Sequence, residues 1–219
     1  MVHLQNNRNS NFPSSNKSQN IHSQLGHTDA VLCVSFNPQG TQLATGSGDK
    51  TVRIWDLDTQ TPLHTLSGHT NWVLYVSWSP DGKKLISGGM DNDLRIWDPN
   101  TGKQMGKPLK GHKKYGNHKI TPTFAVLLKK KIVYSSFPVT AVAWEPLHMN
   151  PYCVRMASAS KDATVIVWDT RKCQMIYALS SHTMSVTCIR WGGQNLLFTG
   201  SQDRTIKVKI ISLSNLRSR

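Results

Sequence analysis

The stretch GHTDAVLCVSFNPQGTQLATGSGDKTVRIWD, residues 26–56, is followed at residues 68–98 by a second copy of the same pattern, GHTNWVLYVSWSPDGKKLISGGMDNDLRIWD. Each copy opens with Gly-His and closes with Trp-Asp, and an Asp stands six residues before the Trp. The same marks return at residues 111–112 and 168–169, and as the variant Ser-His at 181–182. Self-similarity at a fixed spacing indicates a repeat protein, in which each unit buries its apolar face only against a neighbour.

Short strands separated by turns account for the pattern inside each unit. In the first unit VLCVSF (31–36), QLATGS (42–47) and TVRIWD (51–56) are typical of three strands, and VLYVSW, KLISGG and LRIWD repeat them in the second unit. The turns NPQG (37–40) and SPDG (79–82) carry Pro, which presets φ, and Gly, which tolerates the left-handed conformation. The sequence therefore predicts an all-β fold.

These repeats resemble the WD-repeat family of β-propellers, whose units run about 40 to 45 residues and carry the Gly-His and Trp-Asp marks. The resemblance covers residues 26–112 and 140–208. It implies that each repeat supplies a small antiparallel four-stranded blade and that the last strand of a blade comes from the neighbouring repeat. The expected fold class is therefore all-β, a partial β-propeller of about four WD-repeat blades that cannot close as a ring.

Two interruptions break the regular spacing. Between His112 and His182 the chain is longer than one period, and the excess is YGNHKITPTFAVLLKKKIVYSSFPV, residues 115–139. In the fourth unit Lys209 stands where the pattern requires Trp. We interpret residues 115–139 and 209–219 as read-through or alternatively spliced sequence. The expected organisation is a polar disordered N-terminus (1–25), two repeats and the start of a third (26–112), a basic irregular insertion (113–139), the rest of the third repeat and the fourth (140–208), and an atypical tail (209–219).

The recurring His, Asp and Trp are expected to hold each blade together. His27, Ser47 and Asp49 could be combined into a catalytic triad, but a catalytic set occurs once, whereas the His and Asp of this set return from unit to unit. By resemblance to the family, the His, a strand hydroxyl such as Thr45 or Ser47, and the Trp indole N–H form one hydrogen-bonded chain. The expected structural network of the blades consists of His27, Asp49, Trp55, His69, Asp91, Trp97, His112, Asp162, Trp168, His182 and Asp203.

The remaining sequence carries no pattern typical of an enzyme. It contains no G-x-x-x-x-G-K-[ST] loop, no H-E-x-x-H and no G-x-S-x-G motif. The four cysteines, Cys33, Cys153, Cys173 and Cys188, show no C-x-x-C spacing, which argues against a zinc site or a redox pair. We therefore expect a protein that is not an enzyme and has no catalytic residue, cofactor or metal.

Partners of a propeller usually bind the loops at the top of the channel, as the resemblance implies. Two positions in each unit reach that face: the residue before the leading Val of the first strand and the residue before the turn Asp. Trp72 occupies the first position, and an exposed aromatic side chain gives a large contact area at small entropic cost. The alternative, that Trp72 packs against its own blade, stays open. The expected partner-binding residues are Trp72, Met90, Lys161 and Gln202.

The net charge of +14 at pH 7 suggests contact with nucleic acid, because clustered Lys and Arg release counterions from phosphates. Most of this charge lies outside the repeats, in residues 1–25, 113–139 and 209–219, which contain no acidic residue. A direct RNA contact would depend on one lysine cluster, for which the alternative is a solvated loop. That cluster consists of Lys113, Lys114, Lys119, Lys129, Lys130 and Lys131.

Several segments resemble a narrower group, the Notchless family of factors in large ribosomal subunit assembly. Residues 26–85 are similar to the first propeller repeats of that family, and the variants WEPLH (144–148) and WGG (191–193) are unusual among generic WD repeats. The resemblance implies a non-catalytic scaffold in ribosome biogenesis, in the nucleus and nucleolus, that binds protein complexes, the pre-60S ribosomal particles, and contacts rRNA. The alternative is a generic WD-repeat adaptor of another complex, such as a ubiquitin ligase substrate receptor.

Notchless proteins also carry an N-terminal ubiquitin-like domain, which the AAA-type ATPase midasin binds, and a propeller of about eight blades. Only residues 1–25 precede the first repeat here, so we expect that domain to be absent and midasin not to bind. No signal peptide is expected, and the longest apolar run, residues 124–128, is too short to cross roughly 30 Å of hydrocarbon, so no membrane contact is expected. An open arc of four blades would expose two apolar flanks and an unpaired strand edge.

Overall fold

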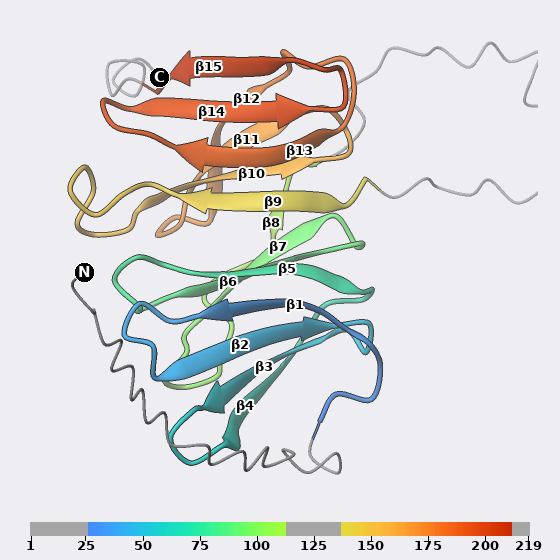
Figure 1. The fold of residues 1–219 in the computed structure, drawn as a ribbon, viewed down its shortest axis with the longest axis vertical. Coiled ribbons are helices and arrows are strands. Elements are labelled where there is room, and N and C mark those ends of the chain that lie inside the picture. The colour runs from blue at the N-terminus through green and yellow to red at the C-terminus, as the bar shows by residue number, and fades with distance from the viewer. Residues whose placement is uncertain (1–25, 113–136, 212–219) are drawn as a thin grey trace, which may run out of the picture.

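The computed structural model describes residues 26–112 and 137–211, and the strands of this part of the chain form four antiparallel sheets in chain order (Figure 1). We call these sheets blades 1 to 4. Blade 1 consists of β1 (Val31–Phe36), β2 (Gln42–Ser47), β3 (Thr51–Asp56) and β4 (Thr61–Ser67). Blade 2 consists of β5 (Val73–Trp78), β6 (Leu85–Gly89), β7 (Asp93–Trp97) and β8 (Leu109–Lys110). Blade 3 consists of β9 (Val139–Trp144), β10 (Arg155–Ser160), β11 (Val165–Asp169) and β12 (Gln174–Leu179), and blade 4 of β13 (Val186–Trp191), β14 (Leu196–Ser201) and β15 (Ile206–Ile210).

The strands confirm the all-β fold of WD-repeat blades that the repeats predict. β1, β2 and β3 span the three stretches expected in the first unit. The outermost strand β4 follows the Trp-Asp pair and pairs with β3, so it lies between the marks of one repeat and those of the next. The described blades form an open arc, with blade 1 at the bottom and blade 4 at the top of Figure 1. Within the described ranges, no helix has the length and apolarity needed to cross a membrane.

Tight turns join the first two strands of blades 1 and 2, where the sequence predicts them. The N–H of Gly40 donates to the carbonyl of Asn37 at 3.0 Å, and the N–H of Gly82 donates to the carbonyl of Ser79 at 2.8 Å. Gly40 and Gly82 have φ angles of 73° and 72°, in the left-handed region that a Cβ disfavours. The glycines therefore allow the chain to reverse within four residues.

Neighbouring blades pack face to face. We call the side of a blade that carries the Trp of its Trp-Asp pair the Trp face, and the opposite side the forward face. Val52 and Ile54 on the forward face of blade 1 share one buried cluster with Val76, Trp78 and Trp97 on the Trp face of blade 2. Two further clusters repeat this arrangement between blades 2 and 3 and between blades 3 and 4. Each boundary within the described arc therefore joins a forward face to a Trp face.

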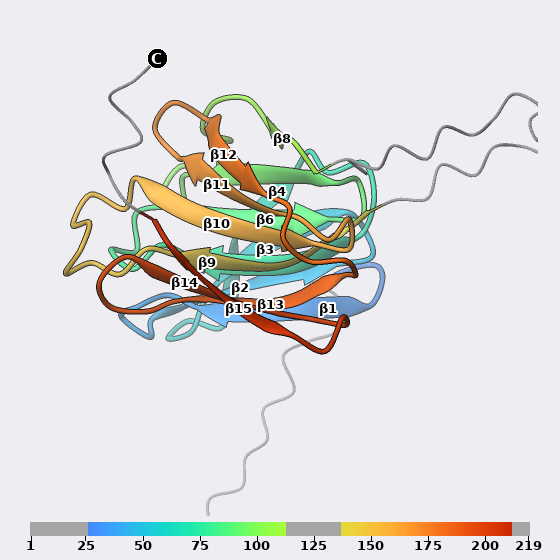
Figure 2. The same ribbon diagram turned by 90° about the horizontal axis from the view of Figure 1, so that it is seen from above.

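The first strands lie on the inner side of the arc. β1 contacts β5, β5 contacts β9, and β9 contacts β13. Figure 2 shows β1, β9 and β13 on one side of the arc and β4, β8 and β12 on the other. The loops that connect the strands consequently gather at the two ends of the blades.

Blade 3 begins earlier than the sequence predicts. Val139 was expected to close the irregular insertion over 113–139, but it is the first residue of β9 and is fully buried. The reason is its position, because Val139 packs against Gly88 of blade 2, where a Cβ would lie 3.0 Å from the valine. Most of the expected insertion, residues 113–136, lies outside the described residues.

Blade 4 has three strands in the described part of the chain. β15 continues through Lys209 and Ile210, so the first residues of the expected atypical tail belong to the sheet. Lys209 pairs with Leu197 and Ile210 pairs with Leu196 in β14. Ile211 is buried in the cluster between blades 3 and 4. Residues 212–219 of the tail, like residues 1–25, lie outside the described residues.

Candidate functional site

A chain of hydrogen bonds joins the recurring His, Asp and Trp of blade 2. Nδ1 of His69 lies 2.9 Å from Oδ2 of Asp91, and Nε2 lies 2.7 Å from Oγ of Ser87. Trp97 donates from Nε1 to the same Oγ at 2.8 Å. Since a carboxylate only accepts, His69 donates from Nδ1 and accepts at Nε2 from the hydroxyl of Ser87, whose oxygen accepts from the indole. Each polar atom of this buried chain therefore has a partner, which is the condition for burying it at low cost.

Blade 1 repeats this geometry. His27 lies 2.8 Å from Asp49 through Nδ1 and 2.7 Å from Thr45 through Nε2. Trp55 donates from Nε1 to Oγ1 of Thr45 at 2.9 Å. Of the two hydroxyls considered from the sequence, Thr45 is the one in the chain, whereas Ser47 donates to a backbone carbonyl in the loop before β1 at 3.1 Å. Both hydroxyls lie on the face of β2 that carries the indole, because they are two residues apart. The difference follows from their positions along the strand, since Trp55 pairs with Leu43, two residues from Thr45 and four from Ser47.

In blade 3 the same chain of hydrogen bonds joins residues that lie on either side of residues 113–136 in the sequence. Nδ1 of His112 lies 3.1 Å from Oδ2 of Asp162, and Nε2 lies 2.7 Å from Oγ of Ser158, to which Trp168 donates at 2.7 Å. His112 and Ser158 are 46 positions apart, against 18 for the corresponding pair in blade 2. The two parts of the third repeat therefore form one blade.

Blade 4 contains the same chain of hydrogen bonds, but without the indole. His182 lies 2.9 Å from Asp203 through Nδ1 and 2.8 Å from Thr199 through Nε2. Lys209 pairs with Leu197 in the register that the Trp has in the other three blades. The structure therefore brings together all the residues of the expected network, in four separate sets.

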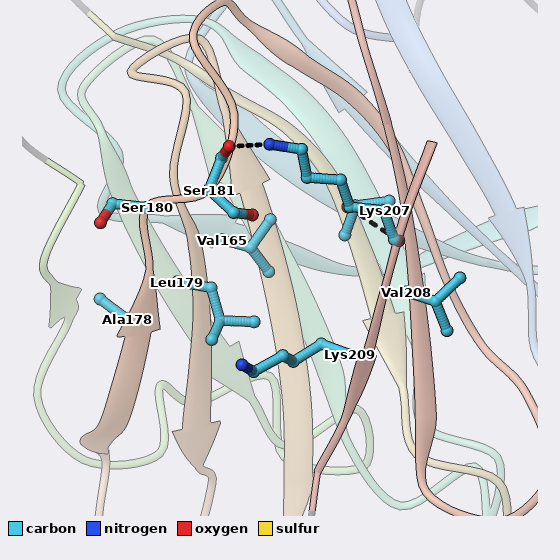
Figure 3. Close-up of a pocket in the computed structure, with 9 residues that line it drawn as sticks. Val165, Ala178, Leu179, Ser180, Ser181, Lys207, Val208 and Lys209 are labelled. Atoms are coloured by element: carbon cyan, nitrogen blue, oxygen red, sulfur yellow. Dashed lines mark hydrogen bonds between the residues drawn. The ribbon is translucent and has the colours of Figure 1, made fainter. Parts of the chain in front are cut away.

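The missing indole leaves a cleft of about 470 Å³ between blades 3 and 4 (Figure 3). Val165 and Leu179 of blade 3 line the cleft opposite Lys207 and Lys209 of β15. Lys207 donates from Nζ to the carbonyl of Ser181, and Figure 3 shows the side chain of Lys209 pointing toward Leu179. The flexible lysine stems cover this apolar surface less completely than a ring.

The indole also decides which residue precedes the His. A Cβ on Gly111 of blade 3 would lie 2.8 Å from Cη2 of Trp168, closer than two carbons can approach, and the corresponding distance in blade 2 is 3.2 Å. In blade 4, where Lys209 replaces the ring, Ser181 replaces the glycine. The Ser-His variant of the fourth repeat therefore occurs in the blade that lacks the Trp.

The Asp of each network also closes the turn between the second and third strands. In blade 1 Asp49 accepts hydrogen bonds from the N–H of Thr28 at 3.0 Å, the N–H of Thr51 at 2.9 Å and the hydroxyl of Thr51 at 2.7 Å. Lys50 in this turn has a φ of 71°, which costs about 1 kcal/mol or more for a residue with a Cβ. The carboxylate holds the backbone in that conformation.

These donors lower the pKa of the carboxyl groups. Burial by itself would raise the pKa of Asp49, but the hydrogen bonds from Thr51, His27 and Thr28 hold it well below its usual range. Burial also opposes the lowered pKa of Asp91, which His69 stabilises as the anion. In the exposed turn of blade 4 the hydroxyl of Thr205 is the main cause of the lowered pKa of Asp203.

Two charged groups that the sequence does not single out lie at the opposite end of the blades, the half-buried Lys84 and the buried Glu145. Lys84 of blade 2 donates from Nζ to the carbonyl of Cys153 at 3.1 Å and to Oγ1 of Thr170 at 3.2 Å, both in blade 3. Burial lowers the pKa of this amine. Glu145 accepts from Nε of Arg155 at 2.8 Å in a buried ion pair inside blade 3. The unusual WEPLH segment contains this glutamate, but its partner is identified only by the fold.

The geometry of the networks suits a structural role. Ser87, the hydroxyl that would act as a nucleophile in a triad, is fully buried and already bonded to both neighbours. A nucleophile must reach its substrate, which this oxygen cannot do. Among residues 26–112 and 137–211, no three His, Cys, Asp or Glu side chains gather in a set that could hold a metal.

At the end of the blades that carries the His–Asp networks, backbone hydrogen bonds join the two loop positions that the sequence assigns to partner binding. The N–H of Met90 donates to the carbonyl of Trp72 at 2.9 Å. Trp72 is 47% exposed, so its ring is only partly covered by its own blade. The same bond joins the corresponding positions of the other blades: Gly48 N–H to Ala30 O, Lys161 N–H to Pro138 O, and Gln202 N–H to Ser185 O.

The four proposed contact residues thus recur at one end of the arc. Lys161 and Gln202 are exposed and Met90 is half-buried. Pro138 and Met184 lie beside the same loops, and the sequence does not single them out. The insertion obscures where β9 begins, after Pro138, and Met184 is 51% exposed. The regular alternation before each leading Val was the signal that could have located Pro138.

A family model for the WD domain, G-beta repeat, matches residues 18–56, 60–98, 129–169 and 172–208. Together with the four blades and their His–Asp networks, this match shows that the chain belongs to the WD-repeat family of β-propeller proteins.

Within that family the chain is similar to proteins named for Notchless and for ribosome assembly. It is 51% identical over 186 residues to Protein Notchless of Drosophila melanogaster, 46% identical over 175 residues to the Notchless protein homolog of Arabidopsis thaliana, and 46% identical over 173 residues to Ribosome assembly protein 4 of Saccharomyces cerevisiae. These matches cover 85%, 80% and 75% of this chain but 33%, 32% and 28% of the relatives. The chain therefore spans about a third of the length of the curated relatives it matches.

A solved structure described as that of U3-55K has the same fold. It matches with a TM-score of 0.67 at 20% sequence identity, over 85% of this chain and 50% of that chain. U3-55K is a WD propeller, and the likeness shows that the four blades have the propeller arrangement.

The coupling between the indole and the preceding glycine can be tested by restoring both in blade 4. The double variant Ser181→Gly/Lys209→Trp should raise the free energy of unfolding by about 2 kcal/mol, because the ring would fill the cleft and donate to Thr199. Lys209→Trp alone should gain less, because the Cβ of Ser181 would meet the ring. Urea denaturation of both variants, with Ser181→Gly as control, measures the difference; equal gains for the single and double variants would contradict the coupling.

The lowered carboxyl pKa values predict a loss of stability in acid. Because the folded state holds the pKa of Asp49, Asp91 and Asp203 below their unfolded value of about 3.9, their contribution is present above that pH and is lost as the pH falls toward the folded values. The urea midpoint, followed by circular dichroism, should therefore fall as the pH drops below about 5. The Asp49→Asn variant should lose less over this range, and a midpoint that is constant with pH would refute the linkage.

Proposed function

We propose that this chain is a non-catalytic scaffold of ribosome assembly that holds components of large-subunit precursors at the blade end carrying Trp72. The observation that carries the proposal is the similarity, at 43% to 51% identity over about 80% of the chain, to Notchless proteins and to Ribosome assembly protein 4. The similarity runs through the repeats, which contain both the networks and the loop positions. The names of these relatives support a role in ribosome assembly for the propeller repeats themselves.

The structure of the blades supports a scaffold in particular. In blade 2 the loop at the Trp72 end is held by the adjacent network, since Asp91 accepts from the N–H of Thr70 at 2.9 Å just before Trp72. The loop therefore presents its side chains on a rigid backbone, which lowers the entropy lost when a partner binds. A half-exposed Trp beside a Met provides the aromatic and flexible apolar contacts that are enriched in protein interfaces.

The absence of catalysis belongs to the same proposal. The His and Asp pairs recur in each described blade, and each is engaged with a buried hydroxyl. A pair that maintains every blade does not define one active site. The chain is therefore proposed to act by binding alone.

Contact with rRNA and a nuclear, nucleolar location complete the proposal. The lysine cluster in residues 113–131 lies outside the described residues and follows His112 in the sequence. Clustered lysines would add phosphate contacts to the protein contacts of the loops. Pre-ribosomal particles offer both kinds of surface.

Removing the proposed aromatic anchor should weaken capture of the particles. The Trp72→Ala variant, used as bait in nuclear extract, should recover severalfold fewer large-subunit precursor proteins, because a central aromatic anchor is worth about 2 kcal/mol. Tyr152→Ala is the matched control, since Tyr152 is 74% exposed in the loop between β9 and β10 at the opposite end. Equal recovery with both variants would contradict the assignment of this end, and cullin components in place of ribosomal precursors would contradict ribosome assembly.

The RNA contact has a separate readout. Changing Lys129, Lys130 and Lys131 to Gln should weaken binding to large-subunit rRNA and reduce the slope of log affinity against log salt by about 2, because three phosphate contacts would be lost. The control changes the exposed lysines Lys83, Lys103 and Lys107 of the repeats to Gln. An unchanged slope in the first variant would show that the segment is only a solvated loop.

A further inference from the structure

The cleft between blades 3 and 4 lies where an indole ring fills the other boundaries of the described arc. At the boundary between blades 1 and 2, Leu66 is 1% exposed and shares one buried cluster with the ring of Trp97. The boundary between blades 2 and 3 repeats this contact. Leu179 holds the position of Leu66 in blade 3 but is only partly buried, and Lys209 faces it in place of the ring. The cleft therefore follows from the side chain at residue 209, between two blades whose facing walls are both described.

A buried oxygen that lines this cleft lacks a hydrogen-bond donor. Because Asp203 accepts from Nδ1 of His182, Nε2 of that ring accepts the single hydroxyl proton of Thr199. The oxygen of Thr199 can then only accept, as the corresponding oxygen of blade 2 does from Trp97. Among the described residues, no group donates to Thr199 in this way. The cleft therefore offers an acceptor that suits the N–H of an aromatic ring.

The two walls of the cleft differ in charge. Val165 and Leu179 make one wall apolar, whereas Lys207 and Lys209 place two amines on the other (Figure 3). No acidic side chain is among the described residues that line the cleft. Lys207 is held in place by its bond to the carbonyl of Ser181. Positive charges beside a wall of low dielectric constant attract an anion, so the cleft favours a ligand with one apolar and one negative end.

We propose that this cleft binds a small aromatic carboxylate with a ring N–H, of the indole-carboxylate class. The ring lies against Leu179, its N–H donates to Thr199, and the carboxylate pairs with Lys209. The cleft volume of about 470 Å³ is typical of small-molecule sites. A free ring is not tied to β15, so it can shift away from the Cβ of Ser181, which a Trp at residue 209 would meet. The site is separate from the loops assigned to ribosome assembly and does not depend on that role.

Three related probes test the three contacts, with the 219-residue chain in a calorimetric titration. Indole-3-acetate should bind saturably, with one molecule per chain. Indole, which lacks the carboxylate, should bind about threefold more weakly, since a solvent-accessible ion pair contributes a factor of this order. 1-Methylindole-3-acetate cannot donate from its ring nitrogen and should bind about fivefold more weakly, because one hydrogen bond would be lost.

Variants of the cleft locate the binding. Lys209→Gln keeps the cleft but removes one charge, so it should bind indole as before while the advantage of indole-3-acetate is lost. Ser181→Gly/Lys209→Trp places a ring in the cleft and should bind neither probe. Its circular dichroism should show folded blades, which separates a filled cleft from an unfolded chain. Lys172→Gln is the matched control, because Lys172 is an exposed lysine in the turn between β11 and β12, away from the cleft.

Several results overturn the inference. If indole-3-acetate does not bind the unaltered chain, or binds the variant with the filled cleft equally well, the cleft is not the site. If Lys209→Gln keeps the preference for indole-3-acetate over indole, the carboxylate does not pair with Lys209. Equal affinities for indole-3-acetate and its 1-methyl derivative would show that the ring N–H does not donate to Thr199.

Discussion

A four-stranded blade has two apolar faces and can bury neither of them by itself, so each blade depends on a neighbour of the same kind. In this chain the dependence is met by one repeated contact, the forward face of one blade against the Trp face of the next. The inner strands, the loop ends and the order of the blades follow from that contact. Val34 of blade 1 and Val208 of blade 4 are apolar as well, like the buried residues at the same positions of other blades.

Packing on this scale also buries polar groups, and the repeated His, Asp and Trp satisfy them. The indole in each of the first three blades donates to a hydroxyl that also bonds the imidazole, and the carboxylate holds the imidazole and the turn beside it. In blade 3 the ring leaves no room for a side chain before the His, which couples the two marks of that repeat. Blade 4 lacks both marks, because Lys209 stands in place of the Trp and Ser181 in place of the Gly.

A rigid set of blades is suited to binding, since the networks hold the loops before a partner arrives. The Trp72 end presents a repeated pair of loop positions in each blade, while at the opposite end the half-buried Lys84 of blade 2 bonds groups of blade 3. The two ends of the arc therefore differ in character, one with exposed loop side chains and the other with hydrogen bonds between blades.

The sequence by itself determined the class of fold, the boundaries of the first blades and the members of the four networks, because those features depend on residues within one repeat. It could not distinguish Thr45 from Ser47 in the network, locate the start of blade 3 at Val139, or identify Arg155 as the partner of Glu145. Only the tertiary structure decided these points, and only it showed that Val208 is exposed where Ile54 is buried. The physical reason is that burial is decided by the neighbouring blade, and a repeat has the same local pattern with or without that neighbour.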